Sequence, residues 1–247
     1  MRVLLFALVA LLFPASVWAK DWDDCLAKGK PDLAIAGCTK ITKNAKETPK
    51  NRALAYYYRG LAQSDKGDYD AAIADYSAGL KLNPGHPESY NNRGADYERT
   101  GNNARALADY SKAIQLKPDW ATAYSNRCWS YYLVGDFKHA LPDCTKALTL
   151  NPKNSHALDS RCAVYVGNKQ YDLAIADCNK AIALDKNYGY PYFNRGDALY
   201  RKGQAAKALA DYKTAARLIP PSNADYRAKV QSRIADIQAG KPAPSTP

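Results

Sequence analysis

The sequence predicts an all-α solenoid of antiparallel helix hairpins, because three columns of residues repeat with one period. A motif of the form Ala-Ile/Leu-x-Asp recurs every 34 residues, beginning at Ala72, Ala106, Ala140, Ala174 and Ala208. An arginine recurs with the same period, at Arg59, Arg93, Arg127, Arg161 and Arg195. A proline closes most units, at Pro84, Pro118, Pro152 and Pro220, and Lys186 stands in the one gap. This regularity is typical of stacked repeats and not of a globular enzyme core.

Each unit divides into two amphipathic helices. In residues 87–120 the apolar side chains of each half are three or four positions apart, as on one face of a helix. Gly101-Asn102 interrupts the pattern and predicts a helix end followed by a new N-cap. Pro142 lies about six residues into its helix, so we expect a kink or a late helix start there.

The columns closely resemble the tetratricopeptide repeat. The eighth position of each unit is small, and its fourth is aromatic or leucine, at Tyr56, Tyr90, Tyr124, Leu158 and Tyr192. The alanine column matches position 20 of that family, and small residues also occupy position 27. The resemblance implies a right-handed superhelix with five repeats in residues 53–220. Their ranges are 53–86, 87–120, 121–154, 155–188 and 189–220.

The segments on either side of the five repeats also have a helical pattern. Residues 20–52 are predicted to form a degenerate repeat, with a four-residue insertion in the loop near Thr48-Pro49. Residues 221–240 are predicted to form a capping helix with Ser222 as N-cap. Its apolar stripe comprises Tyr226, Val230, Ile234 and Ile237. The tail 241–247 is rich in Pro, Ser and Thr, so we expect it to be disordered.

The first 19 residues have the pattern of a secretory signal peptide. Arg2 precedes an apolar run that ends at Pro14, and small residues lead up to a cleavage point after Ala19. A membrane anchor is the alternative, but the run is shorter than the roughly 20 residues that span a bilayer. We therefore expect a periplasmic or secreted protein of a bacterial envelope, with no transmembrane segment after cleavage.

The six cysteines form three local pairs that support export. Cys128 with Cys144 and Cys162 with Cys178 occupy positions 8 and 24 of two units, where the other three units have Gly and Tyr. These positions are equidistant from the turn, so antiparallel helices bring them level. We predict disulfides at 128–144 and 162–178, and a third between Cys25 and Cys38. Reduced, buried thiols are the alternative.

The sequence offers no catalytic constellation. His86, His139 and His156 lie in different units without a nucleophile or acid–base pattern around them, which favours surface or capping roles. There is no Gly-rich phosphate loop, and the cysteine spacing does not match zinc, haem or redox motifs. We predict a non-catalytic protein with no catalytic residues, no metal and no cofactor.

The arginine column has two interpretations. Five arginines at one register would form an anion-binding stripe along the solenoid. Alternatively, each arginine packs against a neighbouring helix and pairs with the repeated aspartates Asp75, Asp109, Asp143, Asp177 and Asp211. The second interpretation is favoured because the arginines stand at a packing position of the family and not on its usual ligand face.

In tetratricopeptide proteins the concave groove is lined mainly by the first helix of each repeat. Carried onto this chain, its positions vary between units and include Glu98 and Asp159. The predicted ligand-groove residues are Tyr57, Asn92, Arg99, Asn126, Trp129, Tyr132, Phe193, Asn194, Asp197 and Tyr200. Trp129, Tyr132 and Phe193 are the expected anchors. The alternative role for Trp129 is to fill the junction between units.

The net charge is +11, or +10 without the signal peptide, and favours acidic partners. Nucleic acid is a poor choice for an exported protein. We predict an exported scaffold that binds a peptide or helix of another protein in its concave groove. The alternative is a binding module for an anionic envelope polymer, a glycan or phosphate-bearing chain. A third possibility, an enzyme with its site in the groove, lacks a visible acid–base pair.

Overall fold

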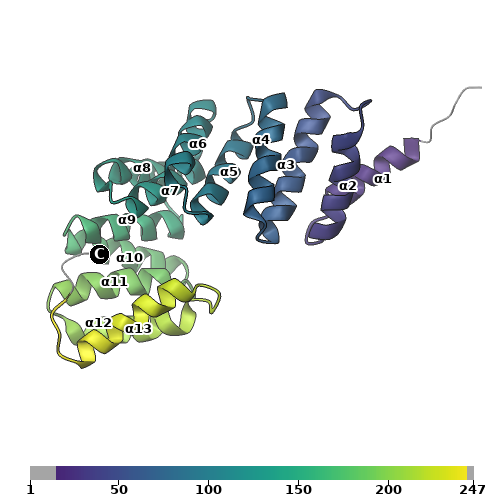
Figure 1. The fold of residues 1–247 in the computed structure, drawn as a ribbon. Coiled ribbons are helices and arrows are strands. Elements are labelled where there is room, and N and C mark those ends of the chain that lie inside the picture. Colours follow the sequence, from purple (N-terminus) through teal and green to yellow (C-terminus); the bar gives the residue numbers. More distant parts are fainter. Residues whose placement is uncertain (1–14, 244–247) are drawn as a thin grey trace, which may run out of the picture. The chain divides into compact units, whose positions relative to one another are not determined.

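The computed structural model describes residues 15–243, and this range contains thirteen α-helices and no strand. The helices are α1 (Ala15–Cys25), α2 (Pro31–Lys43), α3 (Pro49–Asp65), α4 (Tyr69–Leu82), α5 (Pro87–Arg99), α6 (Asn103–Leu116), α7 (Ala121–Leu133), α8 (Phe137–Leu150), α9 (Ser155–Gly167), α10 (Tyr171–Leu184), α11 (Tyr190–Arg201), α12 (Ala205–Leu218) and α13 (Ala224–Gln238). The chain divides into two compact units, with the boundary inside α5 between Asp96 and Tyr97. In each unit consecutive helices pack in pairs, as the predicted solenoid requires (Figure 1).

The first unit contains the hairpins α1–α2 and α3–α4. The N-cap of α3 is Thr48, whose side chain accepts a hydrogen bond from the amide of Asn51. Helix α3 has 17 residues, whereas α7 has 13. The four extra residues therefore extend α3 by about one turn, and the prediction of a longer loop is corrected.

The second unit contains the hairpins α7–α8, α9–α10 and α11–α12. The turns between paired helices need a left-handed residue, and Gly101, Gly135 and Gly203 supply it with φ of 77°, 75° and 76°. The side chain of Asn102 then caps α6 by accepting from the amide of Arg105, as the sequence predicts. The turn chemistry of the repeat thus fixes the hairpin.

The paired helices cross at positions 8 and 24 in two different ways. A Cβ added at Gly60 would lie 2.7 Å from the Tyr76 ring, and one at Gly196 would lie 2.7 Å from the Tyr212 ring. Elsewhere the crossing is closed by the predicted disulfides Cys128–Cys144 and Cys162–Cys178, with Cα–Cα distances of 5.3 and 5.6 Å. The third predicted disulfide, Cys25–Cys38, joins α1 and α2.

The arginine column is engaged in a repeated structural network. Arg127 donates to both carboxylate oxygens of Asp143, at 2.6 and 2.8 Å, and to the hydroxyl of Ser111 in the preceding hairpin. Its guanidinium also lies over the ring of Tyr124. Equivalent ion pairs join Arg59 to Asp75, Arg161 to Asp177, and Arg195 to Asp211. The packing interpretation is confirmed for these pairs, because their guanidinium groups bind neighbouring helices.

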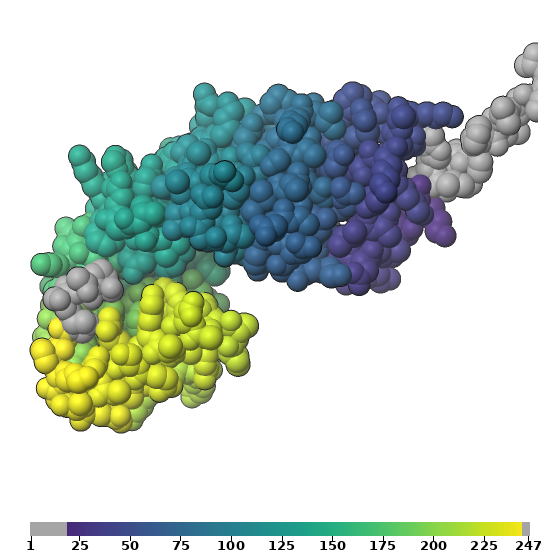
Figure 2. All heavy atoms as spheres, in the orientation of Figure 1, coloured from purple at the N-terminus to yellow at the C-terminus, as the bar shows by residue number. Residues whose placement is uncertain are grey.

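Helix α13 covers the end of the second unit. Its predicted stripe packs on the core formed by α11 and α12, and Val230 is fully buried. The N-cap is Asn223 and not Ser222, because the side chain of Asn223 accepts from the amide of Tyr226. In the space-filling view α13, in yellow, covers the green atoms of these helices (Figure 2). Of the expected tail, Lys241 accepts a hydrogen bond from the Tyr200 hydroxyl, and Ala243 packs against the same core.

Helix α8 is in register with its counterparts despite Pro142. It begins at Phe137, which is 34 residues before the first residue of α10, so the expected late start does not occur.

No helix between residues 15 and 243 has the length and apolar character needed to cross a membrane. The predicted signal sequence lies outside the described residues, except for its last five positions, where α1 begins.

Candidate functional site

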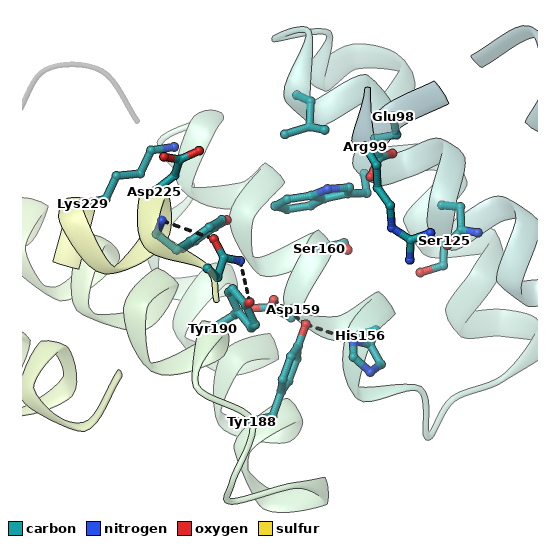
Figure 3. Close-up of a pocket in the computed structure, with 15 residues that line it drawn as sticks. Glu98, Arg99, Ser125, His156, Asp159, Ser160, Tyr188, Tyr190, Asp225 and Lys229 are labelled. Atoms are coloured by element: carbon teal, nitrogen blue, oxygen red, sulfur yellow. Dashed lines mark hydrogen bonds between the residues drawn. The ribbon is translucent and has the colours of Figure 1, made fainter. Parts of the chain in front are cut away.

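The second unit contains a cavity of about 630 Å³ between the first helices of its repeats and α13. One wall comes from α7, with Ser125, Asn126, Trp129 and Leu133. Helix α9 contributes His156, Asp159 and Ser160, and the turn before α11 contributes Tyr188 with Tyr190 at its end. Asn223, Asp225, Tyr226 and Lys229 line the side of α13, and Glu98 and Arg99 close the rim (Figure 3).

Trp129 stacks on Tyr132, with ring centroids 4.9 Å apart and an interplanar angle of 24°. The two rings share a helix face because they are three residues apart. Trp129 is half-buried and lines the cavity. Tyr132 lies deeper, and burial raises the pKa of its phenol to about 12. The cavity therefore has an aromatic wall in which Trp129 is half-buried and stacked on Tyr132.

A hydrogen-bonded cluster lies around Asp159, which is 4% exposed. Its two oxygens accept from Asn194 Nδ2 at 2.9 Å and from the Tyr188 hydroxyl at 3.2 Å. The Tyr188 oxygen is in turn 3.0 Å from His156 Nδ1. Burial raises the pKa of Asp159 to about 7, although the two hydrogen bonds oppose the shift. Figure 3 shows Asp159 and His156 of α9 meeting Tyr188 of the turn before α11.

A second acid, Glu98, lies at the rim. It accepts a hydrogen bond of 2.6 Å from the Ser130 hydroxyl, which lies on the neighbouring α7. Burial raises its pKa above the ordinary value, and the Ser130 hydrogen bond and the charge of Arg99 partly offset the effect. Among residues 15–243 no group of three His, Cys, Asp or Glu side chains could hold a metal ion. The site as described offers aromatic faces, hydrogen bonds and charges for binding.

The predicted groove residues of α11 are buried. Phe193 is 6% exposed and packs against Tyr212 and Tyr226, so α13 covers this expected anchor. Asp197 accepts hydrogen bonds from the Tyr212 hydroxyl and from Arg233 of α13. Tyr200 bonds the backbone of Lys241. Asn194 is also buried and reaches the cavity only through its bond to Asp159.

The remaining predicted residues fall into two places. Arg99, Asn126 and Trp129 line the cavity, with Tyr132 stacked behind Trp129. Tyr57 and Asn92 belong to the first unit, where Asn92 Nδ2 donates to the Tyr57 hydroxyl at 3.4 Å. Burial raises the pKa of that phenol. The Tyr57 ring also lies edge-on against His86, whose Nδ1 accepts from the amide of Ser89 and so caps α5.

Sequence reasoning missed the tyrosines opposite Trp129. Tyr188 and Tyr190 lie in the only repeat boundary where lysine, Lys186, replaces the proline. That departure was the available signal for an altered turn. Gly189 in this turn packs so closely against Ile219 that a Cβ would lie 2.9 Å from its side chain. Tyr226 was assigned only to the capping stripe, and nothing in the spacing placed it at the cavity.

Family models of the tetratricopeptide repeat match residues 53–86, 87–119, 121–154, 163–188 and 189–222. The matched segments together cover more than half of the chain. No curated protein matches the sequence.

The fold is similar to that of several solved structures. A crystal structure of MamA protein is 25% identical, with a TM-score of 0.57, and the alignment covers 67% of this chain and 90% of that one. TTC0263, a thermophilic TPR protein of Thermus thermophilus, is 22% identical with a TM-score of 0.63, covering 74% and 99%. MamA of Desulfovibrio magneticus is 20% identical with a TM-score of 0.59, covering 67% and 94%. Likenesses of this degree establish the fold.

Proposed function

Since this chain belongs to the tetratricopeptide repeat family, whose repeats are generally non-catalytic modules for protein–protein interaction, we propose that it is an exported scaffold. In this proposal the cavity of the second unit binds an extended peptide or a helix of a partner protein. The observation that carries the proposal is the aromatic cavity, about 630 Å³ in volume, with Trp129 half-buried on its wall. Concave sites of this size with aromatic walls and a few polar groups are typical of ligand binding.

The arrangement of Trp129 supports a binding role. Its stack on Tyr132 restricts the indole before any ligand arrives, so little side-chain entropy remains to be lost on binding. Aromatic anchors in partly enclosed positions contribute much of the binding energy at protein interfaces. The side chains of α11 that would extend the groove are covered by α13, so the proposed site centres on α7, α9 and the turn before α11.

The alternative, binding of an anionic envelope polymer, loses its main support. That hypothesis requires the repeated arginines to be available, but Arg59, Arg127, Arg161 and Arg195 each pair with an aspartate. Their side chains are between 17% and 23% exposed. A cavity that combines Glu98 and Asp225 with Arg99 and Lys229 is not a basic surface either.

Export is supported by the three disulfides, because such bonds persist in oxidising compartments and are rare in the reducing cytosol. The N-terminal pattern described above supports the same proposal. A periplasmic or secreted location would bring the protein into contact with envelope proteins.

The test compares Trp129→Ala with Trp120→Ala. Trp120 lies outside the cavity, with Lys117 over its ring, so its replacement removes an equal side chain elsewhere. Immobilised wild-type protein captures partners from an envelope extract, and the bound segment of the partner is then synthesised and titrated. Trp129→Ala should weaken binding of that peptide at least about tenfold, because interface anchors typically contribute more than about 1.4 kcal/mol.

Stability separates the two roles of Trp129. Loss of a core tryptophan typically costs about 3–5 kcal/mol, whereas loss of one aromatic stack costs about 1 kcal/mol. We expect Trp129→Ala to melt within a few degrees of the wild type. A large fall in melting temperature would assign Trp129 to the core, and unchanged peptide binding would refute the proposed site.

A further inference from the structure

Asp159 differs from four other buried aspartates of the second unit in having no cationic partner. Asp143, Asp177 and Asp211 each pair with the arginine of their own repeat, and Asp197 pairs with Arg233. Asp159 is as deeply buried, but it accepts only from the neutral groups of Asn194 and Tyr188. Buried carboxylates in proteins are normally paired, because removing an unpaired charge from water is costly. Among these aspartates, Asp159 is also the one that lines the cavity.

The remaining walls of the cavity present aromatic rings. Tyr190 packs edge-on against Tyr226, with centroids 4.9 Å apart, and Asn223 donates to the Tyr190 hydroxyl at 2.7 Å. Tyr188 lies beside Tyr190, and Trp129 faces the cavity from α7. Ring faces attract cations through their quadrupole, and Lys229 already lies over the Tyr226 ring at 5.3 Å.

The charged residues at the rim do not cancel the preference of the cavity for a cation. Glu98 and Asp225 are balanced in number by Arg99 and Lys229, so the ionised form of Asp159 supplies the excess negative charge. Each Asp159 oxygen accepts one hydrogen bond and, as a carboxylate oxygen, has a second lone pair that can accept another. A planar guanidinium matches both kinds of group, because it donates hydrogen bonds to carboxylate oxygens along its edge and stacks on aromatic rings with its face.

We propose that the cavity binds the arginine side chain of a partner peptide, with its guanidinium between the aromatic rings and the Asp159 carboxylate. This inference rests on the proposed function and names the chemistry of the partner. It assigns a basic residue to the peptide, although the net charge of the whole protein favours acidic partners. Local charge at the site, and not net charge, decides which group is held there.

The binding of arginine should strengthen as the pH rises from about 6 to about 8. The pKa of Asp159 is raised to about 7, and only its ionised form attracts the guanidinium. The groups that face it are the neighbouring Tyr188 and His156, the phenols of Tyr132 and Tyr226, and the rim charges of Glu98, Arg99, Asp225 and Lys229. The phenols stay neutral in this range because burial raises their pKa values.

The probes are two peptides, acetyl-Gly-Arg-Gly-amide and the same peptide with citrulline, which has nearly the shape of arginine but no charge. Binding to full-length protein is followed by the NMR signal of the Trp129 indole N–H, which is identified from its absence in Trp129→Phe. We expect the citrulline peptide to bind at least about tenfold more weakly, because a charge-assisted hydrogen bond is lost. Asp159→Asn should reduce this preference to within about twofold.

The control is Asp119→Asn, which removes the same charge from an exposed position in the turn before α7 and should leave the preference unchanged. Melting curves establish that both variants are folded.

Three results would overturn the inference. The two peptides could bind equally well, the preference for arginine could survive Asp159→Asn, or that preference could fail to vary with pH. If a captured partner still depends on Trp129, the proposed function stands without it. Arginine selectivity without any Trp129-dependent partner would instead contradict the proposed function.

Discussion

The buried carboxylate of Asp159 should make the protein less stable as the pH rises. Its folded pKa of about 7 lies above the unfolded value of about 3.9, so the folded state binds more protons between these values. The stabilising contribution is therefore fully present below about pH 4 and is lost as the pH rises through about 7. A difference of roughly three pKa units corresponds to about 4 kcal/mol, of which about 3 kcal/mol falls between about pH 5 and pH 8.

The perturbation is Asp159→Asn, which removes this titration and keeps a side chain of the same size. The assay is urea unfolding at pH values from about 5 to about 8, followed by circular dichroism with the disulfides intact. Other titrating groups affect both proteins, so the measured quantity is the difference between their free energies of unfolding. We expect the free energy of unfolding of the wild type minus that of the variant to decrease by about 3 kcal/mol as the pH rises from about 5 to about 8. Parallel pH profiles for the two proteins would refute the reasoning.

Two further predictions concern the helix pairs. Replacing Cys162 and Cys178 by serine opens a link between residues 16 apart, and we expect a loss of about 3 kcal/mol in non-reducing thermal unfolding; finding six free thiols in the exported protein would contradict the premise. Pro142→Ala restores a backbone donor within α8, so it should raise the stability of the reduced protein, by up to about 3 kcal/mol; an unchanged melting temperature would show that the missing donor has no cost.

Contacts within a hairpin and between neighbouring repeats were predictable from the sequence, because they recur with its period. The exchange of Gly and Tyr for two cysteines at positions 8 and 24 predicted the disulfides. The structure explains the exchange, since Tyr76 and Tyr212 lie directly over Gly60 and Gly196. The arginine and aspartate columns likewise predicted an ion-pair network. In each case the geometry of one helix pair determines which residue the cysteine or arginine contacts.

The candidate site was only partly predictable. The varying positions of the repeat pointed to Arg99, Asn126 and Trp129, which line the cavity. The same rule selected Phe193, because repeat position alone does not reveal that α13 covers it. The repeat spacing showed that four residues are inserted near Thr48, but it did not show where they lie. An added segment can lengthen either the loop or the start of α3, and both give the same spacing in the sequence.

The sequence by itself determined the repeat, the helix pairs, the disulfides and the pairing of the arginines, since all of these depend on nearest neighbours at a fixed spacing. Only the tertiary structure decided that Tyr188, Tyr226 and Trp129 line one cavity, and that Asp159 is buried there without an arginine. These side chains come from different repeats, and their distances depend on the small rotation between successive helix pairs. That rotation accumulates from the packing of many side chains, so no single spacing in the sequence encodes it.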